Sequence, residues 1–64
     1  MITYRDIELL KRGDEICNTS GEPVAQVIAN DNGLLSLYFF KSGEFCDRDY
    51  RQNAKNGDKV RVAH

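Results

Sequence analysis

The fold is decided by residues 24–40, which read VAQVIANDNGLLSLYFF. Two segments rich in β-branched and aromatic residues, 24–29 and 34–40, lie on either side of a short polar stretch, as in two strands joined by a turn. Asn32 and Gly33 are residue types that accept the positive φ angles of a two-residue hairpin turn. The sequence therefore predicts a β-hairpin as the centre of the fold.

Further strands are predicted on both sides of this hairpin. Turn residues divide the chain roughly every ten residues after Gly13, a spacing typical of small all-β domains. The predicted strands cover about 14–18, 24–29, 34–40, 44–46 and 58–63. Residues 41–44 are predicted to close a second hairpin. Asp47 then fits the cap of one or two helical turns, with Tyr50 and Ala54 on one side.

Before these strands, residues 4–12 are predicted to form a short helix. Thr3 fits its N-cap, and Asp6 stands three residues later, in the position of a capping box. Two basic residues fall in the last turn, where the helix dipole favours cations, and Gly13 follows as a left-handed terminal residue. Residues 1–64 are therefore expected to form a single, mainly β domain. We expect a small five-stranded half-open barrel with a short N-terminal helix, similar in outline to SH3-like barrels.

Size and composition exclude several classes of protein. The chain has 64 residues, 41% of them hydrophobic, and a net charge of −1. It contains no apolar run of about 18 residues that would cross a membrane, and its first six residues are too polar for a secretory signal. We therefore expect a cytoplasmic protein, in whose reducing surroundings Cys17 and Cys46 remain thiols.

Segment 34–40 holds the candidate aromatic binding residues. Alternation places Leu35 and Leu37 on one face of the strand and Tyr38 and Phe40 on the other, so both faces are strongly apolar. One interpretation is a central strand that the N-terminal helix covers on its far side. The other is that the two aromatic residues stand partly exposed as a surface for a partner or for a second copy of the chain.

The basic residues are concentrated near the C-terminus. Residues 1–47 carry a balance of −4, whereas residues 48–64 carry a balance of +3. The basic members of the predicted binding site are Arg48, Arg51, Lys59 and Arg61, and Lys55 lies among them. Such charges bind phosphate or form the polar rim of a protein interface. They also fit a solvated face that offsets neighbouring carboxylates.

The reactive residues do not favour an enzyme. His64 is the last residue, where nothing orients an imidazole, and no Ser or Cys has an evident base. A zinc site built from Cys17, Cys46 and His64 would lack the short ligand spacings of zinc motifs. Asp47 and Asp49 form a pattern too common to indicate a cation site. No catalytic residue, metal, cofactor or small-molecule substrate is therefore predicted.

Three functional hypotheses follow. The first is a non-enzymatic interaction module that binds a protein partner, or a second copy of itself, through the aromatic strand. The alternative is binding of single-stranded nucleic acid or RNA through the same strand and the basic C-terminal segment. The third is an inhibitor or regulator of another macromolecule that works through an acidic face. It requires that four carboxylates lie together: Asp14, Glu15, Glu22 and Asp31.

Overall fold

The hairpin predicted from residues 24–40 is the centre of the structure. In the computed structural model, which describes residues 2–63, β3 (Pro23–Asp31) and β4 (Leu34–Phe39) pair antiparallel. Asn32 and Gly33 join them with φ angles of 54° and 105°, the left-handed values expected of a two-residue turn. The predicted turn is therefore confirmed.

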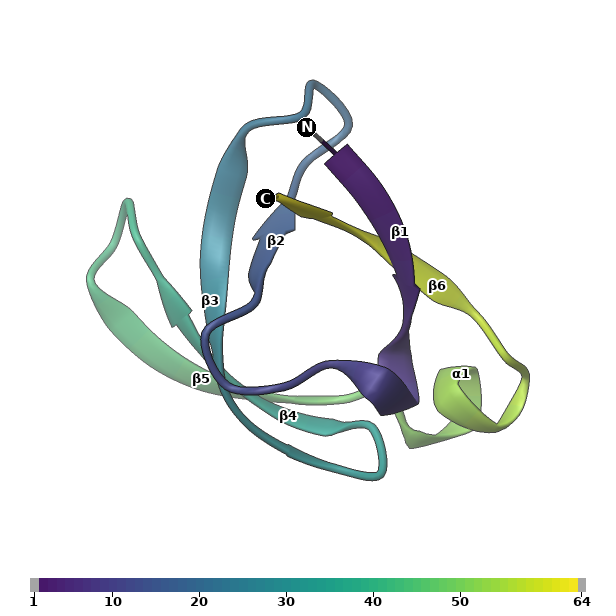
Figure 1. Ribbon diagram of the computed structural model, residues 1–64. Helices are drawn as coiled ribbons and strands as arrows, with labels where there is room; N and C mark the ends of the chain where they lie inside the picture. The colour runs from purple at the N-terminus through teal and green to yellow at the C-terminus, as the bar shows by residue number, and fades with distance from the viewer. Residues whose placement is uncertain (1, 64) are drawn as a thin grey trace.

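Six strands form one antiparallel sheet. The other four are β1 (Ile2–Asp6), β2 (Glu15–Cys17), β5 (Glu44–Asp49) and β6 (Lys59–Ala63). Their order across the sheet is β1-β6-β2-β3-β4-β5. Strands β2 to β5 follow one another as a meander, and β6 returns to lie between β1 and β2 (Figure 1). The edge strands β1 and β5 do not pair with each other within residues 2–63, so the curled sheet is not closed.

The predicted N-terminal helix at 4–12 is wrong, and the prediction of five strands missed a sixth in its place. β1 pairs with β6 along its whole length, from Ile2 opposite Ala63 to Asp6 opposite Lys59. Only η1 (Ile7–Leu9) forms a helical turn, of the 3-10 type. So short a helix is marginal in water, whereas pairing with β6 satisfies the backbone groups of both strands.

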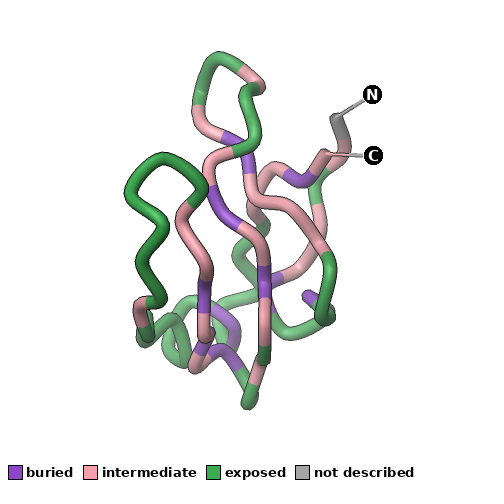
Figure 2. The backbone as a smooth tube through the Cα atoms, turned by 90° about the vertical axis from the view of Figure 1, so that its left-hand side faces the viewer, coloured by how far each residue is buried: buried purple, intermediate pink, exposed green. Residues whose placement is uncertain are grey.

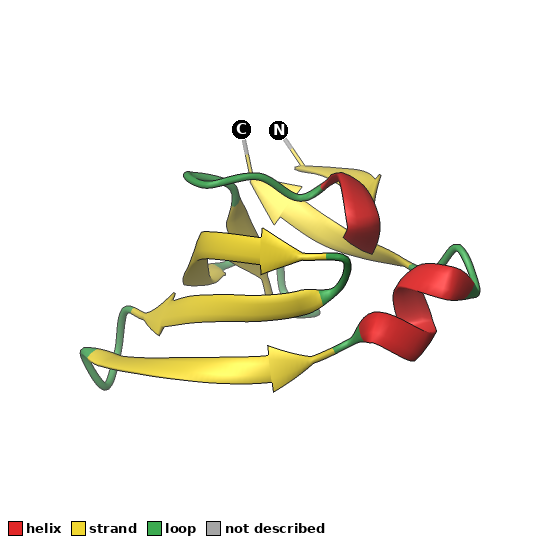
Figure 3. Ribbon diagram, turned by 90° about the horizontal axis from the view of Figure 1, so that it is seen from below, coloured by secondary structure: helices red, strands yellow, loops and turns green. Residues whose placement is uncertain are grey.

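A second short helix, α1 (Arg51–Lys55), follows β5. Helical turns are correctly expected in this region, but Asp47 does not cap them, because it belongs to β5. The strand predicted at 44–46 is therefore longer than expected. α1 packs beside η1, where Ile7 and Ala54 are buried (Figure 3). No helix formed by residues 2–63 is long and apolar enough to cross a membrane.

The core lies inside the curl of the sheet. Its largest fully buried side chains are Val27, Leu35 and Val62, from three different strands, and Leu10 and Leu37 pack with them. Figure 2 shows buried residues along the strands and exposed residues in the turns between them. Each such side chain contributes about 1.5–3 kcal/mol by leaving water, so these few residues supply much of the stability of the domain.

Asn30 ties the segment after β1 to this core. Its side-chain amide donates hydrogen bonds to the carbonyl oxygens of Ile7 and Leu10, both at 2.9 Å. Its Oδ1 atom accepts a hydrogen bond from the Gly33 N–H, also at 2.9 Å. One side chain therefore fixes both the 3-10 turn and the β3–β4 turn.

Candidate interaction site

Three aromatic side chains meet on the outer side of the β4–β5 hairpin. The ring centroid of Tyr38 lies 5.9 Å from that of Phe40 in an edge-to-face arrangement, and 4.9 Å from that of Phe45 in a tilted one. Aromatic pairs attract each other at such separations. We call Tyr38, Phe40 and Phe45 the aromatic cluster.

Strand alternation and register bring the cluster together. Alternation turns Tyr38 away from the core, because its neighbour Leu37 is buried there. Tyr38 stands directly opposite Phe45 in the β4–β5 ladder. Phe40 follows the end of β4, where its N–H donates a hydrogen bond to the Val24 carbonyl at 3.1 Å. The backbone therefore holds all three rings at one end of the hairpin.

The aromatic cluster is incompletely covered. Phe45 is 70% exposed and Phe40 is 40% exposed, whereas Tyr38 is half-buried between them. The N-terminal segment does not cover this face, because Leu10 is buried in the core beside Leu37, on the other side of β4. A domain with so small a core gains stability from each buried ring. Grouped exposed rings are therefore typical of a surface that meets a partner.

Away from the cluster, the outer face of the hairpin carries carboxylates. Asp47 accepts a hydrogen bond from the Ser36 hydroxyl at 2.9 Å. Asp49 binds the Arg51 guanidinium through two hydrogen bonds, at 3.0 and 2.8 Å. These side-chain hydrogen bonds lower the pKa of Asp49 to about 2, and they raise the pKa of Arg51. Within residues 2–63, no cation pairs with Asp47.

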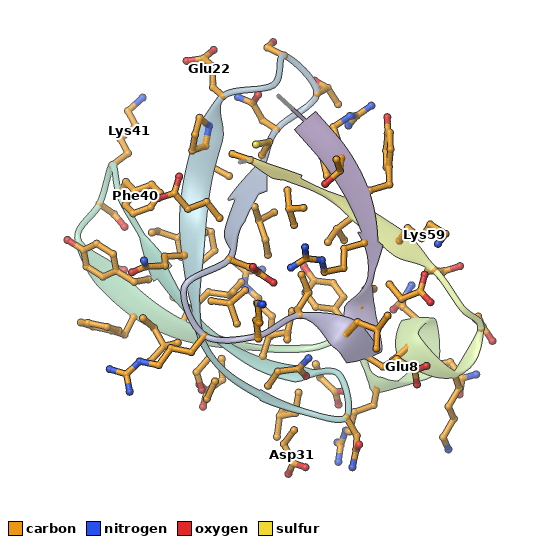
Figure 4. All side chains as sticks on the ribbon, viewed as in Figure 1. Glu8, Glu22, Asp31, Phe40, Lys41 and Lys59 are labelled. Carbon is orange, nitrogen blue, oxygen red and sulfur yellow. The ribbon has the colours of Figure 1, made fainter. Side chains whose placement is uncertain are left out.

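The basic residues predicted on the last strand do not lie beside the aromatic cluster. Lys59 forms an ion pair with Asp6 at 2.7 Å, and the Arg61 guanidinium lies 5.6 Å from the centre of the Tyr4 ring. Their strand, β6, is separated from β4 by β2 and β3. Figure 4 accordingly shows Lys59 and Phe40 on opposite sides of the molecule.

Arg48 and Arg51 belong to the hairpin and its extension, but they too lie apart from the cluster. Arg51 begins α1 and is occupied by its ion pair. Arg48 lies on the other face of β5, with its guanidinium 5.4 Å from the centre of the Phe39 ring. The structure therefore brings together Tyr38 and Phe40 among the predicted binding residues. It places the four basic ones elsewhere, and their role in binding stays a prediction.

A groove of about 600 Å³ lies on the opposite side of the hairpin from the aromatic cluster. Its walls include Val24, Phe39, Glu44, Cys46 and Arg48. Apolar atoms thus line its floor, and charges of both signs stand at its rim. Glu44, Cys46 and Arg48 belong to β5, which is the last strand of the sheet. The groove therefore borders the free edge of the sheet.

The carboxylates of the acidic-face hypothesis do not lie together. Glu22 and Asp31 stand at the two ends of β3, and Figure 4 shows them at opposite ends of the molecule. Asp14 accepts hydrogen bonds from the Arg5 guanidinium at 2.8 Å and from the Lys11 N–H at 3.0 Å. Burial opposes the ionisation of Asp14, but these bonds outweigh burial and lower its pKa. This geometry gives the hypothesis no support.

The two cysteines lie on separate strands. Cys17 is buried in β2 and Cys46 is half-buried in β5; both are free thiols, with β3 and β4 between their strands. No group of three or more metal-ligating side chains occurs among residues 2–63. His64, the third ligand considered above, lies outside the described residues.

Phe45 is the member of the cluster that the sequence analysis missed. A turn at 41–44 would set Phe45 opposite Phe40. The observed turn spans residues 40–43 and begins one residue earlier, so Phe45 stands opposite Tyr38. Both turns place Phe45 on the face of Tyr38 and Phe40, because directly opposite residues of an antiparallel pair lie on the same face. The signal was therefore present in the spacing of the second hairpin, but the sequence analysis considered the aromatic residues of segment 34–40 alone.

Comparison with known proteins adds no relative. No protein-family model, no curated protein and no solved structure matches this chain. Its function is therefore argued from the geometry of the site.

Proposed function

We propose that this protein is a non-enzymatic interaction module whose aromatic cluster binds a protein partner. The observation that carries the proposal is the contact of three rings on one side of the hairpin, with Phe45 70% and Phe40 40% exposed. Aromatic residues are enriched in the buried centres of protein interfaces, where each ring removes a large area from water. Asp47 at the far end of the same face supplies a polar rim.

A protein partner is favoured over nucleic acid by the position of the cations. Single-stranded nucleic acid needs basic groups close to the stacking rings, because the rings bind the bases and the cations bind the phosphates. Here Lys41 lies beside Phe40, but Lys59 and Arg51 are already paired with carboxylates, and β2 and β3 separate β6 from β4. The aromatic cluster therefore fits an apolar patch of a protein better than a charged backbone.

We also propose that the sheet belongs to the SH3-like half-open barrels. Two features support this assignment: the meander from β2 to β5, and the return of β6 beside β2. In this interpretation β1 is an additional strand on the edge of a five-stranded unit. A cytoplasmic location stays a prediction.

Affinity capture with matched variants tests the binding proposal. Phe45→Ser removes the most exposed ring of the cluster, and Tyr4→Ser removes a ring that is 61% exposed on β1. In a nuclease-treated native lysate, we expect wild type and Tyr4→Ser to retain the same protein, and Phe45→Ser to lose it. With the purified partner, Phe45→Ser should weaken binding about tenfold or more.

Two results would count against the proposal. Retention that disappears with nuclease treatment would favour the nucleic-acid alternative. Binding of the purified partner that is equal for wild type and Phe45→Ser would show that the cluster is not the contact surface.

A further inference from the structure

The free edge of β5 carries backbone groups without a strand partner. The Tyr50 N–H donates a hydrogen bond to the Gly33 carbonyl at 2.8 Å, which sets the alternation of the β4–β5 ladder. Counting back from Tyr50, the N–H and C=O groups of Phe45, Asp47 and Asp49 point away from β4. β5 ends the sheet, so no strand formed by residues 2–63 pairs with them. Such an edge is a template for another strand.

One face of β5 also carries two unpaired charges of opposite sign, placed symmetrically about Cys46. Glu44 lies two residues before Cys46 and Arg48 lies two residues after it, so all three side chains share the face that borders the groove. Neither charged residue forms an ion pair within residues 2–63. A two-fold axis at Cys46 would bring each charge opposite its counterpart.

We propose that β5 pairs antiparallel with β5 of a second copy of the chain, about a two-fold axis at Cys46, to form one sheet across both copies. In this register Glu44 of each copy stands opposite Arg48 of the other, which gives two ion pairs. Phe45 of each copy stands opposite Asp47 of the other. These residues exchange about four backbone hydrogen bonds in all, because their N–H and C=O groups point outward.

The other symmetrical registers of β5 do not set opposite charges across from each other at Glu44 and Arg48. An axis at Asp47 sets two carboxylates directly opposite each other, and an axis at Arg48 sets two guanidinium groups opposite each other. An axis at Phe45 leaves Glu44 opposite Cys46, so both charges remain unpaired. Charge complementarity therefore selects the axis at Cys46.

The same register affects the outer face. The two Phe45 rings become diagonal neighbours across the new strand pair, at a backbone separation of about 7–8 Å, which aromatic side chains bridge. Tyr38 and Phe40 lie farther from the edge and stay free for a partner. The inference thus goes beyond the proposed function, and either can fail without the other.

Sedimentation velocity from micromolar to millimolar concentration tests the ion pairs. We expect wild type to form a reversible dimer. Arg48→Glu and Glu44→Arg each set like charges opposite each other twice per dimer, and each should raise the dissociation constant about tenfold or more. The double variant Glu44→Arg/Arg48→Glu restores both pairs with their signs exchanged, and should recover the wild-type dissociation constant.

Circular dichroism checks that each of these variants is folded. A wild type that stays monomeric at millimolar concentration would overturn the proposal. So would a folded double variant that associates as weakly as the two single variants.

Oxidative cross-linking tests the position of the axis. Cys46 occupies a non-hydrogen-bonded position in the proposed pair, where Cα atoms lie about 4.5 Å apart, within the span of a disulfide. Diamide accepts two electrons and two protons from the two thiols, leaving one S–S bond and the reduced hydrazine. We expect a covalent dimer, reversed by dithiothreitol, from wild type and Cys17→Ala, and none from Cys46→Ala.

Absence of the covalent dimer under conditions where sedimentation shows association would exclude an axis at Cys46. Phe40→Ala supplies the remaining control, because the Phe40 ring contacts Tyr38 and lies farther from the edge than Phe45. It should weaken capture of the protein partner and leave both the dissociation constant of the dimer and the cross-link unchanged. A failure of self-association and a failure of partner binding are therefore distinguishable.

Discussion

The two edge strands of the sheet, β1 and β5, carry similar types of side chain but differ in how many of these side chains have a partner within the chain. On β1, Asp6 accepts a hydrogen bond from Lys59 at 2.7 Å, and the Tyr4 ring lies beneath Arg61. On β5, Glu44 has no ion pair within residues 2–63, and every β5 side chain except that of Cys46 is exposed. Both edges hold acidic, basic and aromatic residues. Arg5 and Asp6 of β1 each form an ion pair, whereas within residues 2–63 Asp49 is the only charged residue of β5 that does.

Charged and aromatic residues on a sheet edge therefore have two different roles in this small domain. Residue type alone marks β1 and β5 equally as candidate surfaces. The deciding property is whether the chain itself provides the partner. Substitutions beside β1 are therefore expected to change the free energy of unfolding, whereas substitutions on β5 are expected to change association.

The largest effect is expected where the turn supports the end of β5. Gly33 has a φ of 105°, and a Cβ atom added there would lie 2.8 Å from both the Arg51 Cα and the Tyr50 carbonyl oxygen. Gly33→Ala combines left-handed strain with a backbone shift, so we expect it to lower the free energy of unfolding by about 3 kcal/mol. Urea denaturation measures this loss.

Gly13→Ala is the matched control. Gly13 has a φ of 98°, but a Cβ atom there would meet nothing within 4 Å. Only the strain of a left-handed backbone applies at this position, so we expect the free energy of unfolding to fall by about 1 kcal/mol. Equal losses for the two variants would show that the close approach at Gly33 does not constrain the end of β5.

The next effect belongs to the β1 side of the comparison. Asn30→Ala removes the two hydrogen bonds to Ile7 and Leu10 and the one from Gly33. At about 1 kcal/mol for each bond, we expect the free energy of unfolding to fall by about 2–3 kcal/mol. Gln26→Ala, on the same strand and without such bonds within residues 2–63, should change it by less than about 1 kcal/mol. If thermal and urea unfolding rank the two variants equally, Asn30 does not anchor the segment after β1.

The contrast between these regions also explains which elements could be predicted from the sequence. The β3–β4 hairpin was predictable because Asn32 and Gly33 are adjacent residues that encode their turn locally. β1 was not, because its conformation depends on pairing with β6 near the other end of the chain. Thr3 and Asp6 fit a helix cap equally well as isolated residues, and long-range pairing overrides such local preferences.

The candidate site shows the same division. Tyr38 and Phe40 could be identified from alternation within one strand. Their separation from Lys59 could not, since it follows from the order of strands in the sheet and not from the sequence of any one strand. Phe45 could be added only by pairing the next strand with this one, and either placement of the turn, at 41–44 or at 40–43, sets it beside Tyr38 and Phe40.

A smaller effect, with a pH signature, is expected at the ion pair between β1 and the start of β2. The Arg5 and Asp14 side chains are only 27% and 13% exposed, and the pKa of Asp14 is lowered from 3.8. Asp14→Asn should therefore lower the free energy of unfolding by about 1 kcal/mol at pH 7.

The direction of the pH dependence follows from the lowered pKa of Asp14. The folded protein favours the Asp14 carboxylate, so its contribution is present above about pH 4 and is lost as the pH falls through the lower folded value. The difference between wild type and Asp14→Asn should thus be constant from about pH 7 to pH 5 and shrink below about pH 4. Glu22→Gln, at an exposed position without an ion pair in residues 2–63, serves as the control. A difference that grows on acidification would show that Asp14 does not stabilise the fold as a carboxylate.

The smallest effect compares the two edges directly. Asp6→Asn and Glu44→Gln each remove one carboxylate charge from an edge strand, but only Asp6 has a cation beside it, with the Lys59 side chain 58% exposed. We expect Asp6→Asn to cost about 0.5 kcal/mol in low salt and nothing measurable in about 1 M NaCl, because exposed ion pairs are weak and screened. At concentrations where the chain is monomeric, Glu44→Gln should leave the free energy of unfolding unchanged at both salt concentrations. Equal costs for the two variants would mean that Glu44 is satisfied within one chain, and would remove the charge argument for pairing at β5.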